Sequence, residues 1–143
     1  MTLYTNVETS YSHTAGSMYL QEPVKFQAVR DDSRGMLTSE KNGIKIGKGI
    51  HHVNVRGIIT ALHSENDGRE LFIYIRKNNK IYSENIQYMP NSQKRNTVDT
   101  FINYLEVAEG DLIQLYVAMD NANFKIEGVN YAAITQLSVE VVD

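Results

Sequence analysis

Residues 105–117 read LEVAEGDLIQLYV and contain two alternating apolar runs around a short acidic turn. Apolar residues occupy every second position on both sides of Glu109-Gly110-Asp111. This period of two is typical of half-buried β-strands. Two such runs joined by a tight turn that contains glycine predict a β-hairpin.

The same period of two recurs along most of the chain. Leu71, Ile73 and Ile75 share one face of an expected strand that ends at Asn78-Asn79, and two asparagines suit a two-residue hairpin turn because they tolerate positive φ. About eight or nine such runs follow one another at roughly 8–12-residue spacing, without helical patterns between them. The sequence therefore predicts an all-β fold, either a sandwich or a barrel.

Composition restricts the classes of partner. The 143 residues correspond to one domain, and the net charge of −3 comes from interspersed acids and bases, which argues against nucleic acid as a partner. No apolar run approaches the roughly 18 residues that a membrane span requires, and the first residues lack the basic and apolar regions of a signal peptide. We therefore expect a protein that is synthesised in the cytoplasm without a signal peptide and that does not insert into membranes.

The first 22 residues differ from the rest. Residues 1–22 are rich in threonine, serine and tyrosine without a regular period, so we expect an N-terminal arm, extended or partly disordered, before a folded domain at residues 23–143. Two interpretations are open: a frayed terminus, or an assembly arm that orders against a neighbouring chain. In the second, Tyr4, Tyr11 and Tyr19 supply the contact area.

Residues with catalytic or metal-binding chemistry are scattered. His51 and His52 are adjacent, and neighbouring side chains of a strand point to opposite faces, so the two cannot bind one metal ion together. Glu65, Asp67 and Glu70 lie in a turn, and no serine has the G-x-S-x-G surroundings of a hydrolase nucleophile. We expect no catalytic residues, no metal and no cofactor, and hence a protein that is not an enzyme.

Several expected strands carry apolar residues on both faces. One face belongs to the core, and the second needs a cover, for which another copy of the chain is the simplest candidate. Packing by the N-terminal arm is the alternative. The residues expected at the interface between copies are Ile58, Phe72, Tyr74, Ile102 and Tyr104.

Four segments resemble the C1q/TNF-like jelly-roll family in order and spacing. GDLIQL at 110–115 resembles its A-G-D-x-V-x-L signature, and GIHHVNV at 49–55 resembles its G-x-Y-x-F-x-aromatic strand. LFIYIRKNNKIYS at 71–83 is similar to the strand that ends in a K-N-G turn, and ITQLSVEVV at 134–142 occupies the place of the closing strand. The resemblance implies a two-sheet antiparallel jelly-roll sandwich that assembles as a homotrimer.

The departures from the family pattern bear on function. His51, Val53 and Val55 stand where the animal pattern has aromatic residues, which is closer to the aliphatic-rich versions of bacterial spore-surface and phage virion proteins. The 143 residues contain no collagen-like Gly-X-Y repeat, so we do not expect a collagen-tailed protein. The resemblance therefore favours a bacterial or bacteriophage type of head domain.

The expected function is that of a non-enzymatic trimeric structural or adhesive protein on a virion or other extracellular particle surface. As a phage or prophage virion component, it would decorate a capsid, or form a tail-fibre or baseplate head that binds host-surface carbohydrate. Its partners would be itself, the larger virion or surface assembly, and that carbohydrate. Two alternatives are a secreted cytokine- or complement-like receptor-binding ligand, and a small cupin-like enzyme, which would need clustered histidines.

Overall fold

The computed structural model describes residues 1–11, 22–90, 95–120, 123–128 and 135–143, and all regular structure in these ranges is β-strand. The strands are β1 (Thr2–Tyr4), β2 (Thr9–Tyr11), β3 (Glu22–Pro23), β4 (Ala28–Arg30), β5 (Leu37–Glu40), β6 (Gly43–Ile46), β7 (His52–Leu62), β8 (Arg69–Lys77), β9 (Lys80–Met89), β10 (Arg95–Glu106), β11 (Leu112–Met119), β12 (Phe124–Ile126) and β13 (Gln136–Val141).

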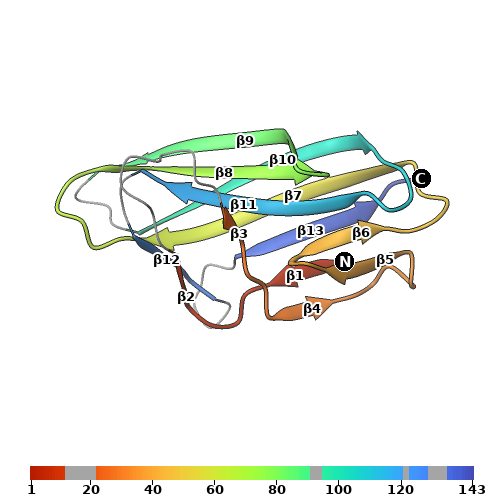
Figure 1. Cartoon of the computed structure of the whole chain (residues 1–143), viewed down its shortest axis with the longest axis horizontal. Coiled ribbons are helices and arrows are strands. Elements are labelled where there is room, and N and C mark those ends of the chain that lie inside the picture. Colours follow the sequence, from red (N-terminus) through yellow and green to blue (C-terminus); the bar gives the residue numbers. More distant parts are fainter. Residues whose placement is uncertain (12–21, 91–94, 121–122, 129–134) are drawn as a thin grey trace.

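The strands form two antiparallel sheets packed face to face, which confirms the predicted two-sheet sandwich. Sheet A has the order β2-β12-β7-β13-β1-β4, with β10 paired to the other side of β7. Sheet B has the order β5-β6-β11-β8-β9, with β3 also paired to β11. In Figure 1, β9 and β10 run along one edge of the sandwich, and β4 and β5 lie at the opposite edge.

The core lies between the two sheets and is aliphatic. Val53, Val55 and Ile59 of β7 face it from sheet A, because alternate residues of a strand share a face, and all three are buried. Gly57 stands in the same row, where a Cβ atom would lie 2.5 Å from the side chain of Leu115 in sheet B. The missing side chain at Gly57 therefore makes room for Leu115.

The β8–β9 hairpin confirms the turn predicted at Asn78-Asn79. Lys77 pairs with Lys80, so these two asparagines form a two-residue loop, with φ values of 50° and 67°. Positive φ at both positions matches the right-handed twist of the flanking strands.

Residues 105–117, by contrast, do not form the predicted hairpin. β10 ends at Glu106 and pairs with β7 in sheet A, whereas β11 begins at Leu112 and pairs with β8 and β6 in sheet B. The turn carries the chain from one sheet to the other, and its Gly110 N–H donates to the carbonyl oxygen of Ile46 at 2.8 Å. Alternation identified both strands correctly, but it does not determine the partner with which each strand pairs.

The first eleven residues belong to the sandwich, contrary to the expectation that its strands begin near Pro23. β1 lies between β13 and β4, and β2 pairs with β12. Leu3 and Tyr11 are both buried in the main core. Strands of three residues are too short to show a period in sequence, which explains the error. The rest of the expected arm, residues 12–21, lies outside the described residues.

Candidate interaction surface

Two aromatic residues of β10 are exposed on the outer face of sheet A. Phe101 is 60 % exposed and Tyr104 is 63 % exposed. Aromatic side chains bring a large hydrophobic free energy when they are buried, so two such rings on one strand mark a surface suited to contact with another molecule.

A β-bulge determines which residues of β10 point outward. The register with β7 shifts between Ile102 and Leu105, and Tyr104 has a φ of 59°, in the left-handed region. Ile102 consequently packs against the main core, while Tyr104 lies outside. The expected interface residues included both Ile102 and Tyr104, but the structure places the two on opposite faces, because a bulge interrupts strict alternation.

Tyr104 is held by two other side chains of the outer face. Its ring is stacked on that of His52, with centroids 3.9 Å apart and an interplanar angle of 8°. Its backbone N–H donates to Asn54 Oδ1 at 2.9 Å. His52 Nδ1 donates in turn to Asp143 Oδ2 at 3.0 Å, and this hydrogen bond is the main cause that lowers the pKa of the Asp143 carboxyl. Asp143 Oδ1 also accepts the backbone N–H of His52 at 2.7 Å.

Ile81 and Tyr82 of β9, in sheet B, and Phe101 and Tyr104 of β10, in sheet A, are exposed on the two strands that form one edge of the sandwich (Figure 1), and we refer to these four residues as the edge patch. β9 and β10 belong to different sheets and are tied together by side chains: Asn85 Nδ2 donates to the carbonyl oxygen of Asp99 at 2.8 Å. Two lysines flank the patch. Lys77 Nζ and Lys80 Nζ lie 4.8 Å and 5.6 Å from the centre of the Tyr82 ring. Lys77 Nζ is also paired with Asp111 Oδ2 at 3.9 Å and donates to the carbonyl oxygen of Glu106 at 3.0 Å.

A polar groove of about 350 Å³ lies on the outer face of sheet A, beside the edge patch; we call it the face groove. Its lining includes Asn54, Arg56, Phe101, Asn103, Ser138 and Glu140. Glu140 is exposed, whereas Arg56 Nη2 is paired with Asp99 Oδ2 at 3.1 Å. The groove thus presents the Glu140 carboxylate and the Arg56 guanidinium among amide and hydroxyl groups.

Two of the expected interface residues lie elsewhere. Phe72 and Tyr74 of β8 point to the outer side of sheet B, but they are only 8 % and 6 % exposed in the single chain. Their rings are parallel at 6.5 Å and pack with Ala118 and Tyr116 of β11 in a small second cluster. A neighbouring copy is not needed to bury them. Ile58, in contrast, is half-buried on the outer face of sheet A.

The expected arm residues are also placed in part. Tyr4 is half-buried in β1, where it pairs with Gln136 on one side and Ala28 on the other. Tyr11 is stacked on Phe124 at 5.3 Å, and burial raises the pKa of its hydroxyl. Both tyrosines therefore contact their own chain. Tyr19 lies outside the described residues.

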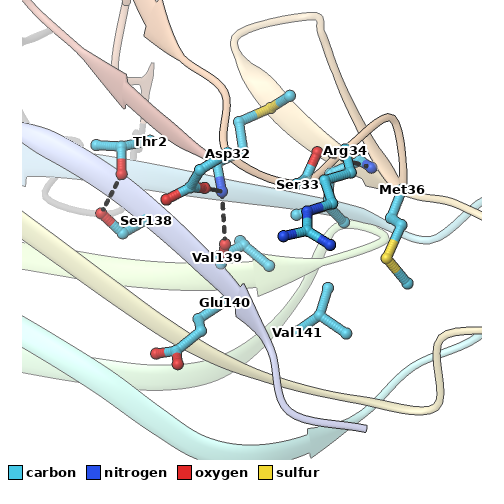
Figure 2. A pocket seen from close by; sticks show the side chains of 11 residues that line it. Thr2, Asp32, Ser33, Arg34, Met36, Ser138, Val139, Glu140 and Val141 are labelled. Atoms are coloured by element: carbon cyan, nitrogen blue, oxygen red, sulfur yellow. Dashed lines mark hydrogen bonds and ion pairs between the residues drawn. The ribbon is translucent and has the colours of Figure 1, made fainter.

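A second cavity, of about 420 Å³, lies beside β1 and the end of β13 (Figure 2). The Met1 ammonium group donates to Asp32 Oδ1 at 3.1 Å and to the carbonyl oxygen of Val139 at 2.9 Å. The hydrogen bond from Met1 lowers the pKa of Asp32. Arg34 adopts a left-handed φ of 57° and its side chain lines the same cavity.

Within the described ranges, no group of three or more histidine, aspartate or glutamate side chains is arranged to hold a metal ion. The described residues also include no helix long and apolar enough to cross a membrane.

The fold is similar to a solved structure described as Eiger TNF from S. frugiperda. The TM-score is 0.63 at 11% sequence identity, and the match covers 100% of this chain and 93% of that one. At this identity the likeness shows the fold alone, and it confirms the expected TNF-type jelly roll. No family model and no curated protein sequence matches the chain.

Reasoning from sequence did not single out Phe101, Ile81 and Tyr82, which the structure exposes. A signal was present for the last two, because Ile81 and Tyr82 directly follow the correctly predicted turn at Asn78-Asn79. No sequence signal marked the bulge that turns Tyr104 outward.

Proposed function

We propose that this protein is a non-enzymatic homotrimer that serves as a structural or adhesive component of a particle surface. The observation that supports self-association is the pair of exposed rings, Phe101 and Tyr104, beside the face groove on the outer face of sheet A. An exposed aromatic surface of this kind is suited to contact with another molecule, and a further copy of the chain is the simplest candidate. The family resemblance favours a ring of three.

The chemistry of the two surfaces supports such a contact. The edge patch carries exposed rings bordered by Lys80, while Lys77 is paired with Asp111, and the face groove carries the exposed carboxylate of Glu140. Opposite charges around an aromatic centre favour specific association and suppress wrong registers. Ile58, half-buried on the same outer face, would add apolar area to the contact.

The oligomeric state tests this proposal directly. We expect light scattering coupled to size-exclusion chromatography to give three times the mass of one chain at micromolar concentration. A second measurement at low and high salt should show faster dissociation at high salt, because screening weakens the charged border. A monomer at every accessible concentration would contradict the proposal.

The particle-surface role rests on the sequence resemblance, in particular on the aliphatic residues Val53 and Val55 where the animal pattern has aromatic ones. In this role the trimer decorates a phage capsid, or forms the head of a tail fibre or baseplate protein that binds host-surface carbohydrate. Antibodies against the trimer should label the surface of particles purified from the producing culture in the electron microscope. Label confined to the particle-free supernatant would count against it.

A receptor-binding ligand is the second candidate, and the likeness to a TNF structure over the whole chain favours it. The two roles share self-association and differ in partner. A fluorescent trimer that binds saturably to cells, and loses this binding after mild protease treatment of the cells, would support the ligand role. Binding that survives protease but not glycosidase treatment would support the adhesive role.

A further inference from the structure

We propose that a cavity at one end of sheet A binds sugar-acid units of a surface saccharide, and that Lys125 pairs with the carboxylate of the sugar. The cavity has a volume of about 400 Å³, within the range of small-molecule sites in proteins, and we call it the end cavity. The inference rests on the adhesive form of the function proposed above, and it names the site and the class of ligand.

Three strands of sheet A bring the lining residues of the end cavity together. β12 lies between β2 and β7, with Lys125 paired to Ser10 on one side and to Leu62 on the other. β2 ends at Tyr11, β7 ends at Leu62 and β12 begins at Phe124. The three strands therefore terminate together, at the end of the sandwich that lies away from the C-terminus (Figure 1).

Two of the buried lining residues are aromatic. Tyr11 and Phe124 stack with ring centroids 5.3 Å apart and an interplanar angle of 9°. The Tyr11 ring is held in place because its hydroxyl oxygen accepts the backbone N–H of Lys25 at 2.8 Å. The C–H groups of a pyranose ring suit contact with rigid apolar side chains of this kind.

The exposed lining residues carry groups that both donate and accept hydrogen bonds. Ser10 and Ser64 offer hydroxyl groups, and Asn123 offers an amide. The turn that carries Ser64 is fixed by the buried His63, whose Nδ1 accepts the backbone N–H of Glu65 at 3.1 Å. Saccharide hydroxyls also donate and accept, so this side of the end cavity matches them.

Lys125 adds a preference for negative charge. Among the described lining residues, Lys125 carries a full positive charge and none carries a carboxylate. Its Nζ is paired with Glu8 Oε1 at 3.3 Å, and both side chains are exposed to solvent to a large extent. An exposed ion pair contributes little free energy, so Lys125 can exchange Glu8 for a sugar carboxylate at small cost. A hexuronic acid, which is a pyranose with one carboxylate, satisfies all parts of the end cavity.

The first test compares two probes that differ in one group. Methyl β-D-glucuronide carries a carboxylate where methyl β-D-glucoside carries a hydroxymethyl group. In amide NMR titrations of the full chain, we expect the glucuronide to shift the signals of Ser64 and Lys125, and the glucoside to bind about 10-fold more weakly. Equal binding of the two glycosides, or shifts confined to other parts of the chain, would overturn the inference.

Two substitutions with opposite expected effects sharpen the test. Lys125→Gln removes the charge but keeps a polar side chain, and it should weaken glucuronide binding about 10-fold. Glu8→Gln removes the competing carboxylate and should strengthen glucuronide binding about 2- to 3-fold. Binding of the glucoside should change little in both variants. A general disturbance of the cavity would weaken binding in both variants alike, and that result would overturn the role of Lys125.

The β5–β6 hairpin of sheet B supplies matched controls. Lys45 Nζ and Glu40 Oε2 form a similarly exposed ion pair, 3.8 Å apart. Lys45→Gln and Glu40→Gln make the same changes in net charge as the two variants at the end cavity, and neither should alter glucuronide binding. A loss in Lys45→Gln as large as that in Lys125→Gln would show that net charge alone governs binding, and would overturn the site.

The outcomes separate this inference from the proposed function. A trimer that binds neither glycoside would overturn the end cavity as a saccharide site and leave the homotrimer standing. A monomer that binds the glucuronide through Lys125 would overturn the homotrimer and support the site. A trimer that binds the glucuronide equally well with Lys125→Gln would keep the adhesive role and overturn the end cavity as its site.

Discussion

The outer sides of the two sheets carry the same kind of residue in opposite situations. Phe72 and Tyr74 on sheet B are buried within the single chain, whereas Phe101 and Tyr104 on sheet A are about 60 % exposed. All four lie on strands whose other face lines the core. An apolar second face in a sequence therefore indicates that a cover exists, and it does not reveal whether the cover is the chain itself or another molecule.

The largest effect is expected from removing the strands that complete sheet A. Deletion of residues 1–11 takes away β1 and β2, together with the buried Leu3 and Tyr11. We expect the truncated chain to lose cooperative unfolding, because β13, β4 and β12 lose hydrogen-bonded partners and the core is opened. Circular dichroism during heating checks this. A truncated chain with an unchanged melting curve would mean that sheet A is stable without these two strands.

A paired substitution tests the comparison itself. Phe72→Ala should lower the free energy of unfolding of the chain by about 3–5 kcal/mol, because it opens a cavity in a buried cluster. Phe101→Ala removes an exposed ring and should change it by less than about 0.5 kcal/mol. Urea unfolding below the trimer dissociation concentration gives both values. Similar losses of stability for the two variants would show that Phe72 on sheet B and Phe101 on sheet A are buried to a similar extent within the single chain.

A substitution in the core between the two sheets should destabilise the fold without changing either outer face. A methyl group at Gly57 would lie 2.5 Å from the Leu115 side chain, so Gly57→Ala should cost about 1–3 kcal/mol through overpacking. Urea unfolding measures this loss, and trimer formation at saturating concentration should persist. A neutral result would mean that Leu115 moves aside more easily than the packing suggests.

The smallest effect concerns the pKa of Asp143, which is hydrogen-bonded to His52 beside the exposed Tyr104 ring. The hydrogen bond from His52 lowers the pKa of Asp143 below the ordinary value of 3.8. The stabilisation from this carboxylate is therefore present above pH 3.8, and it is lost as the pH falls through the lower value of the folded protein. Carboxyl carbon shifts in an NMR titration should place the Asp143 midpoint below 3.8 in the wild type and nearer to 3.8 in His52→Ala. Identical midpoints in the two proteins would show that the hydrogen bond from His52 does not lower the pKa of Asp143.

The sequence was sufficient where local chemistry determines local structure. Asn78-Asn79 predicted the β8–β9 turn because few residues accept positive φ at two successive positions, and the alternation in β7 and β8 identified the core residues of both sheets. It was insufficient where the outcome depends on distant partners. The turn at Gly110 joins two sheets rather than two strands of one, and no residue within 105–117 encodes that difference.

The candidate surface could be predicted only in part, for the same reason. Tyr104 was correctly expected to face outward, but Ile102 was wrongly placed on the same face. The error arose because the bulge depends on how β10 pairs with β7. The support from Asp143 could not be foreseen, because 91 residues separate it from His52.

The pairing of β1 with β13 has a consequence for how the protein is made. Thr2 and Ser138 are hydrogen-bonded neighbours although 136 residues separate them. On the ribosome, the first strand emerges long before the partner beside which it will lie, and sheet A stays incomplete until residues 136–141 have been synthesised. Pairing over such distances is slow, on the order of milliseconds to seconds for sandwiches, so the first strand has to wait for its partner before sheet A can close. Ser138 and Glu140 of the face groove lie on that late strand. Under the proposed trimer, subunits would therefore meet only after β13 has joined sheet A.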